Sequence, residues 1–430
     1  MTSAASSVRA SPSIRQEKSS AMKHKFTSPS RRIRALVGAV AVVATIPLVL
    51  TGCSGSGSAS TDSKTLTIED YYAANYNPIY KQCAATVGAK LDINHVAGAG
   101  LIAKVLQQAS SKTLPDVLML DNPDVQQIAS SGALSDLSAY GLSASGDVPG
   151  VKAANTYKGK LYGLQPATNS IALYYNKKLL AAAGVQPPKT WDELQAAAKK
   201  LTKGSTYGFA MSNINTYEGT WQFLPMFWSN GGDEKDIATP EATQALTFVE
   251  GLQNDGSLSK SSINWAQADV NNQFIAGKAA MMINGPWQLP ALNAAKGLEF
   301  DSVPIPTRTG SDTVAPLGGE AFTVPQTGDK TKMQLAGKFV GCLNSVKMQK
   351  VIAGATGNVP TNIEAGAAWA TDHPQVASFV TTVQTARART GELGPDWPKA
   401  ATKIYTAVQL ALTGKASPEA ALKQAQSQEQ

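Results

Sequence analysis

The sequence predicts an α/β fold in which helices pack on a largely parallel sheet. The first observation behind this prediction is the order of segments near the start of the globular part. Apolar strand candidates at 66–68, 91–96 and 114–120 alternate with helical segments through 79–83 and 101–109. A strand–helix–strand–helix–strand order is typical of a parallel sheet, because each parallel connection needs a crossover.

The second observation is the stretch 274–287, which reads as a helix end, a Gly277 stop and an apolar strand over 279–283. Glycine at a helix end supplies the left-handed residue that side chains resist. Asn284-Gly-Pro then breaks the strand and leaves Trp287 in a loop just beyond it. In α/β folds this is where ligands bind. Trp287 is therefore predicted either to stack on a ligand such as a sugar ring or to pack as a core aromatic.

The basic net charge comes from the N-terminal leader. Residues 1–52 hold eight of the 38 Lys and Arg residues and one of the 31 acidic residues, so the remaining chain has 30 of each. A nearly neutral body does not indicate binding to nucleic acid, and no nucleic-acid partner is expected.

The leader has the parts of an export signal, preceded by an N-terminal extension whose start is Met1 or Met22. Three arginines (Arg31, Arg32 and Arg34) precede the apolar run 35–50, which is too short for a typical membrane-spanning helix and contains Pro47. Small residues then precede Cys53, as in a bacterial lipobox, so residues 1–52 are interpreted as a lipoprotein signal peptide. The alternative is an ordinary signal peptide followed by a chance cysteine. Arg34 stands where the twin-arginine motif has an apolar residue, which favours the general export route.

Cys53 is the predicted lipidation site, and 53–63 is a Ser/Gly-rich tether. The mature protein is expected to be exported and held by acyl chains such as palmitate on the outer face of the cell membrane.

Two cysteines, Cys83 and Cys342, remain in the globular part. In an oxidising compartment an even pair favours a disulfide, although two buried thiols are the alternative. His95 and His373 are the only histidines after the leader, and Cys-x-x-Cys does not occur. No metal site is expected.

Gly98, Gly100 and Ala103 imitate a dinucleotide fingerprint, with Asp121 at the end of the next strand. The preceding segment 91–96 is half polar, which does not suit a buried first strand. No cofactor is therefore predicted.

The remaining elements follow from caps, turns and apolar periodicity. Thr190 and Glu193 form a capping box, and Thr239-Pro-Glu starts another helix. Helix 217–230 is dense in aromatic residues and is expected to be mostly core. The other expected elements are a hairpin at 157–165, strands at 171–175, 300–305 and 321–324, and helices at 176–184, 335–343 and 400–412.

Several blocks together resemble the family 1 extracellular solute-binding proteins of ABC transporters. Residues 274–287 form the most specific block, Tyr174-Tyr-Asn-Lys-Lys-Leu-Leu with 188–194 forms a second, and 317–319 and 394–398 are weaker. The order and spacing of these blocks extend the resemblance over the whole mature chain.

The resemblance implies a type II-like periplasmic-binding-protein fold, with two α/β lobes, hinge strands and an interlobe cleft that closes on the ligand. One lobe is expected at 64–170 plus 302–365 and the other at 171–301 plus 366–430. On this assignment Cys83 and Cys342 lie on helices of one lobe, which supports their disulfide.

Ligand-binding positions are also implied by the resemblance. Leu120 stands where the maltose-binding pattern has a stacking tryptophan, and the last long helix lacks a matching one. These departures argue against maltose itself, but not against a carbohydrate in general. The expected ligand-binding residues are Trp287, Asn169, Asn122, Asp124, Trp221, Gly318, Gly319 and Trp397.

The resulting prediction is a monomeric substrate-binding lipoprotein that captures a sugar and delivers it to the membrane permease of an ABC importer. One alternative is a non-sugar solute, such as a polyamine or a phosphodiester. A secreted glycan hydrolase is the other. The chain has no Gly-x-Ser-x-Gly and few histidines, so an enzyme is not predicted, although a carboxylate pair could act on glycans.

Overall fold

The computed structural model describes residues 63–72 and 74–428. The predicted signal peptide, Cys53 and all of the tether except Ser63 lie outside the described residues. Within the described part, none of the helices combines the length and apolar character needed to span a bilayer.

A five-stranded sheet is built mainly from the first hundred described residues. β1 pairs in parallel with β2 and β3, which confirms the parallel arrangement predicted from the strand–helix alternation. β13 joins from about 200 residues further along the chain and runs antiparallel to β3 and β6. The strand order is β2 (Lys90–His95), β1 (Thr65–Asp70), β3 (Val117–Asp121), β13 (Glu320–Thr323) and β6 (Gly163–Leu164).

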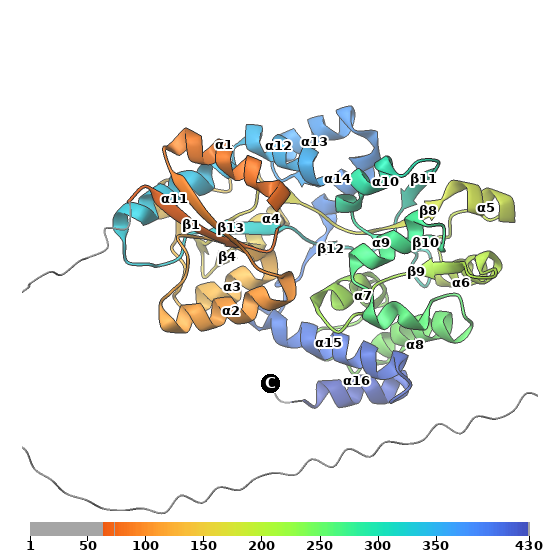
Figure 1. Ribbon diagram of the computed structural model, residues 1–430. Helices are drawn as coiled ribbons and strands as arrows, with labels where there is room; N and C mark the ends of the chain where they lie inside the picture. Colours follow the sequence, from red (N-terminus) through yellow and green to blue (C-terminus); the bar gives the residue numbers. More distant parts are fainter. Residues whose placement is uncertain (1–62, 73, 429–430) are drawn as a thin grey trace, which may run out of the picture. The chain divides into compact units, whose positions relative to one another are not determined.

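Helices and two short turns pack around this sheet (Figure 1). Apolar side chains on alternate positions of β1, such as Leu66 and Ile68, are buried in its core. The surrounding elements are η1 (Ala74–Tyr76), α1 (Asn77–Val87), α2 (Gly98–Ser111), α3 (Asn122–Ser130), η2 (Leu137–Tyr140), α4 (Pro149–Ala154), the hairpin β4 (Thr156–Tyr157) with β5 (Lys160–Leu161), α11 (Lys330–Leu343) and α12 (Val346–Thr356).

A second, four-stranded sheet has its own core. β10, the strand predicted after Gly277, is buried along its whole length and pairs antiparallel with β8 and parallel with β9. Gly277 has φ of +66°, as expected for the residue that separates the helix from this strand. The order is β11 (Phe300–Val303), β8 (Ala172–Asn176), β10 (Ala279–Asn284) and β9 (Tyr207–Ala210).

The helices around the second sheet include the last two of the chain, because α15 and α16 pack with α7 and α8. The capping box of Thr190 and Glu193 is present at the start of α6, as predicted. The elements are α5 (Lys177–Ala183), α6 (Trp191–Leu201), α7 (Tyr217–Ser229), α8 (Pro240–Asn254), η3 (Lys260–Asn264), α9 (Gln267–Ile275), η4 (Pro286–Gln288), α10 (Leu289–Ala294), α13 (Ile363–Asp372), η5 (Pro374–Val376), α14 (Ala377–Thr385), α15 (Trp397–Leu412) and α16 (Pro418–Gln426). The short η6 (Gly394–Asp396) contacts both α3 and α15.

The two sheets with their helices form two lobes, between which the chain passes repeatedly. It leaves the first sheet after β6 and enters the second at β8, then returns between β11 and β13. Short ladders lie along these crossings: β7 (Ala167–Thr168) pairs with β14 (Val359–Pro360), and β12 (Pro316–Leu317) pairs with β15 (Arg387–Ala388). The exact lobe boundaries given above stay a prediction.

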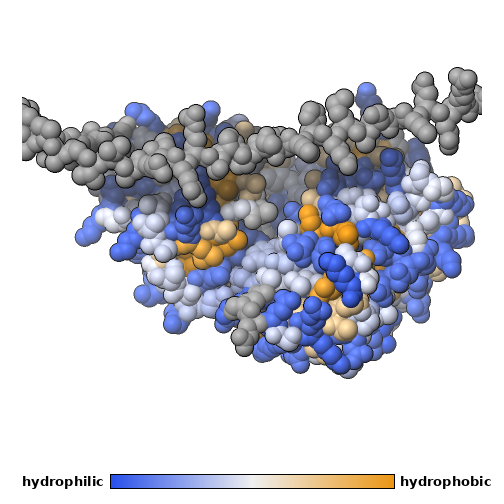
Figure 2. Space-filling model, turned by 60° about the horizontal axis from the view of Figure 1, so that its bottom comes forward, coloured by the Kyte–Doolittle hydropathy of each residue, from blue (hydrophilic) through white to orange (hydrophobic). Residues whose placement is uncertain are grey.

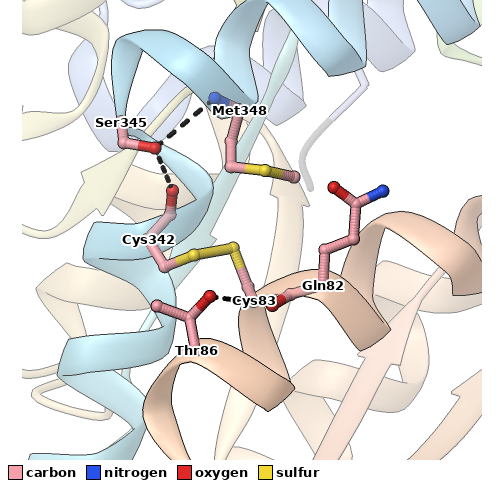
Figure 3. The surroundings of a disulfide bond; sticks show 6 residues. All are labelled: Gln82, Cys83, Thr86, Cys342, Ser345 and Met348. Atoms are coloured by element: carbon pink, nitrogen blue, oxygen red, sulfur yellow. Dashed lines mark hydrogen bonds between the residues drawn. A yellow bond between two sulfur atoms is a disulfide. The ribbon is translucent and has the colours of Figure 1, made fainter.

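Cys83 on α1 and Cys342 on α11 form a disulfide, with their Cα atoms 5.7 Å apart (Figure 3). Both helices pack on the five-stranded sheet. The bond therefore joins two segments of one lobe that are 259 residues apart in the sequence.

The surface is mainly polar. Figure 2 shows a face on which hydrophilic side chains surround small apolar patches. Among the described residues, the exposed large hydrophobic side chains are Leu106, Val346 and Ile363.

Candidate ligand-binding site

The site begins where strand β3 ends. Asp121 is the last residue of β3, and Asn122 and Asp124 lie in the first turn of α3. β13 is the antiparallel neighbour of β3, and its register places Glu320 opposite Asp121. Two strand ends that are far apart in sequence thus bring their carboxylates together.

Arg389, just after β15, joins this strand end to the other lobe. Its Nη1 and Nη2 donate to Asp121 at 2.7 and 2.5 Å, and Nη2 also donates to Asn122 Oδ1 at 3.0 Å. The guanidinium lies 4.6 Å from the ring centre of Trp221 on α7. A planar guanidinium can make this bidentate contact and stack at the same time, whereas an ammonium cannot. The residues around the Arg389 guanidinium, which include Asp121, Asn122 and Trp221, form the Arg389 cluster.

Arg387, two residues earlier in the sequence, also combines an ion pair with a tryptophan contact. Its Nη2 donates to Glu234 at 2.7 Å, and its guanidinium lies 4.7 Å from the ring of Trp228. Trp221 and Trp228 are seven residues apart on α7, so they share one face of the helix. The extended segment around β15 therefore presents two arginines to two tryptophans.

The crossing strands approach the Arg389 cluster closely at Gly318 and Gly319. Asn169 and Gly318 exchange backbone hydrogen bonds, and Gln165 Nε2 donates to the Gly318 carbonyl at 2.9 Å. A Cβ on Gly318 would lie 2.2 Å from Asn169 Oδ1 and 2.5 Å from the Trp221 ring. Gly319 has φ of +122°, and its Cβ would lie 2.2 Å from Gln165 Nε2. Only glycine allows these contacts without displacement.

Two tyrosines that follow β1 bind the carboxylate of Glu320. Tyr71 donates to Oε1 at 2.8 Å and Tyr72 to Oε2 at 2.7 Å. Burial raises the pKa of Glu320, while the tyrosine hydrogen bonds and Arg389 oppose the rise. Burial and the Glu320 charge also raise the pKa of both tyrosines, so their hydroxyls remain neutral donors.

Three buried polar atoms in the cluster have no hydrogen-bond partner: Asp124 Oδ1, Trp221 Nε1 and Arg389 Nε. Burial raises the pKa of Asp124 to about 8, helped by Asp121 and opposed by Arg389. An unpaired buried polar group costs roughly 1–3 kcal/mol. Two donors and one acceptor within one cluster can pair with hydroxyl groups, which both donate and accept.

No group of three His, Cys, Asp or Glu residues in the described part of the chain could hold a metal ion. Two surface cavities, of about 280 and 490 Å³, are lined by other residues. In this conformation the cluster side chains contact one another directly.

Five of the predicted ligand-binding residues meet in this cluster, and Asp124 interacts with it through its charge. Trp287 does not join it: the indole is partly buried in η4 and packs against the core of the second lobe. Trp397 is 1% exposed, and its ring centre lies 6.2 Å from that of Trp228, so its contacts here are those of a core residue. Its ligand contact stays a prediction. The five that meet are Asn122, Asn169, Trp221, Gly318 and Gly319.

Sequence reasoning missed the residues that hold the cluster together. A usable signal existed for two of them, because Asp121 ends one parallel strand and Tyr71 directly follows another, at the sheet edge where α/β folds place ligand contacts. Arg389 and Gln165 lie in short, irregular segments without periodicity. The missed residues are Asp121, Arg389, Gln165, Glu320, Tyr71 and Tyr72.

Comparison with known proteins assigns the chain to a family. The family model described as "bacterial extracellular solute-binding protein" matches residues 78–378. The chain belongs to the bacterial extracellular solute-binding proteins. This confirms the family that the sequence blocks predicted.

Relatives of this solute-binding protein carry names of the same kind. It is 28% identical to the maltooligosaccharide ABC transporter solute-binding lipoprotein of Streptococcus pneumoniae, over 72% of this chain and 74% of the relative. It is 26% identical to the galactooligosaccharide-binding protein of Bacillus subtilis, over 73% and 76%. These relatives are named as binding proteins, not as enzymes.

A solved structure supports the two-lobed fold. The maltose-bound MalE3 of T. maritima superposes with a TM-score of 0.76, covering 84% of this chain and 98% of that one, at 24% sequence identity. At this identity the likeness concerns the fold.

Proposed function

We propose that this solute-binding protein captures a mono- or oligosaccharide between its lobes and delivers it, chemically unchanged, to the permease of an ABC importer. The observation that carries the proposal is the Arg389 cluster, in which residues of both lobes meet around unpaired donors and an unpaired acceptor. Saccharide hydroxyls can satisfy both kinds of group, and relatives named for maltooligosaccharides and galactooligosaccharides support this ligand class.

The ligand would enter the site when the two lobes move apart. The guanidinium of Arg389 contacts Asp121 and Asn122 on one side and the Trp221 ring on the other. Opening the hinge would separate these groups, and closure around a solute would bury them again. The lipidated Cys53 would keep the receptor close to its permease, and the tether would let the two lobes reach it.

The direct test is a thermal-shift screen of the mature protein against mono- and oligosaccharides, followed by titration calorimetry. A ligand that binds only the native state raises the melting temperature in a concentration-dependent way. Binding without turnover supports a receptor. Sustained release of product from glycans would instead support a hydrolase, and a hit restricted to polyamines or phosphodiesters would replace the sugar.

Trp287 tests the extent of the binding surface. If its partly exposed indole face meets the ligand in the closed form, Trp287→Ala weakens the best saccharide by about 1–3 kcal/mol, the scale of a lost aromatic contact. Trp369→Ala is the matched control, since Trp369 is partly buried and stacks on His373. Equal affinities for wild type and Trp287→Ala would return Trp287 to a packing role.

A further inference from the structure

We propose that the part of the site around Asp124 receives an amino group, so that the preferred solute is a saccharide carrying a primary ammonium. The inference rests on the proposed function, since it names the class of saccharide that the same site takes.

The first step is the charge of the cluster. Asp121, Asp124 and Glu320 bring three carboxyl groups together, while Arg389 is the one cation among them. Both Nη atoms of Arg389 are already engaged by Asp121 and Asn122. The arginine is thus a component of the site's framework and leaves little positive charge for an acidic ligand.

The second step is the unpaired oxygen of Asp124. The residue is 5% exposed, and its Oδ1 is buried without a hydrogen-bond partner. A buried carboxylate needs a donor and preferably a counter-charge. A hydroxyl supplies one donor and no charge, whereas a primary ammonium supplies three donors and the charge.

The third step is the phenol of Tyr217, which is close enough to Asp124 for its pKa to respond to the charge of that residue. Tyr217, at the start of α7 in the other lobe, is half-buried, and burial followed by the charge of Asp124 raises the pKa of its phenol. The phenol therefore stays neutral and can accept a hydrogen bond from the same ammonium. With Asp124 on α3 and Tyr217 on α7, the amino group would be held from both lobes.

Burial and the neighbouring Asp121 also keep a proton on Asp124, because they raise its pKa to about 8. A bound ammonium would favour the ionised carboxylate and displace that proton. A carboxylate-bearing sugar would bring a negative charge close to the carboxyl groups of Asp121, Asp124 and Glu320, while the hydrogen bonds of both Arg389 Nη atoms are already used by Asp121 and Asn122.

The experiment is titration calorimetry of the full mature protein with saccharides that differ in one group. The probes are glucose, glucosamine, N-acetylglucosamine and glucuronic acid, each as a monosaccharide and as the terminal unit of a trisaccharide. We expect the free amine to bind about tenfold more tightly than its neutral counterparts and the acid to bind most weakly, since a charge-assisted hydrogen bond supplies this difference.

The variant Asp124→Asn removes the charge and keeps the shape. It should reduce the preference for the amine over its neutral counterpart to within about twofold, and because the preference is a ratio of two affinities, any loss common to both saccharides cancels. Asp147→Asn is the matched control: Asp147 is also buried with an unpaired Oδ2, and its backbone bridges to Asn362, outside the Arg389 cluster. This control should keep the full preference.

Several outcomes would overturn the inference. Neutral saccharides that bind as well as the amine in the wild type would refute it and leave the proposed function standing; this comparison needs no variant. A preference that survives in Asp124→Asn would place the amino group elsewhere. If none of these glucose derivatives binds, the inference fails, whereas the proposed function is decided by the wider thermal-shift screen of mono- and oligosaccharides.

Discussion

At the scale of single residues, the site depends on groups that are costly when unpaired. Arg389 is 5% exposed by its side chain and is stabilised by one carboxylate, one amide oxygen and one indole. Asp124 differs from Arg389 in its partners, because its carboxyl group is buried and one of its oxygens has no hydrogen-bond partner. The two residues therefore respond differently to substitution.

Arg389→Ala should lower the free energy of unfolding by about 3 kcal/mol, because it leaves Asp121 without its buried partner. It should also weaken ligand binding. Arg387→Ala breaks the similar pair with Glu234 outside the cluster, so it should lower stability but keep the ligand affinity. Urea unfolding and calorimetry of both variants test this. Unchanged stability of Arg389→Ala would mean that the ion pair is not formed in solution.

The pH dependence of the free energy of unfolding should reveal the raised pKa of Asp124. Its pKa of about 8 in the folded protein lies above the ordinary value of 3.8. The folded state therefore binds more protons than the unfolded state between these values, and stability falls as pH rises from about 4 to 8. Asp124→Asn lacks this titration.

Urea unfolding of both proteins at pH 4, 6 and 8 measures the difference. The wild type should lose at least ~1 kcal/mol relative to Asp124→Asn across this range, the equivalent of one pKa unit. Parallel curves for the two proteins would contradict the raised pKa.

At the scale of elements, some features of the fold depend on neighbouring residues and others on pairing between distant segments. The capping box of α6 and the left-handed Gly277 after α9 depend on neighbouring residues, and both were predictable. β13 is different, since its position beside β3 depends on the return of the chain from the second lobe. The disulfide between α1 and α11 likewise joins distant segments.

Replacing both cysteines, as Cys83→Ser with Cys342→Ser, should reduce the free energy of unfolding by about 2–5 kcal/mol. The main reason is that the unfolded chain regains the freedom that a long closed loop removes. Reduced wild type is the control and should match the variant in urea unfolding. Alkylation of both thiols in the denatured, unreduced protein would show that the bond is not formed.

At the scale of the whole molecule, two lobes with separate cores are connected by short crossing strands. The cluster around Arg389 lies at these crossings, where Gly318 touches both Asn169 and Trp221. A change in the angle between the lobes would act directly on these contacts, so ligand binding at the proposed site would be coupled to lobe movement.

The proposed lipidation of Cys53 gives a prediction for the sequence with its leader. Cys53→Ser should move the protein from the membrane fraction to the soluble fraction of expressing cells, because the acyl chains supply the membrane affinity. Ser54→Ala, next to the same cleavage site, should leave the protein in the membrane fraction. Sedimentation followed by immunoblotting measures this. Membrane retention of Cys53→Ser in the absence of its permease would exclude the anchor.

The sequence by itself determined the α/β class, the parallel start of the first sheet, several helix caps and the family. Apolar periodicity, turn residues and caps act over a few residues, so they can be read along the chain. Only the tertiary structure decided that Arg389 meets Asp121 from 268 residues away, that β13 enters the first sheet, and that Trp397 lies in the core. No local pattern encodes these contacts, because each joins segments that are distant in sequence and that only the folded chain brings together.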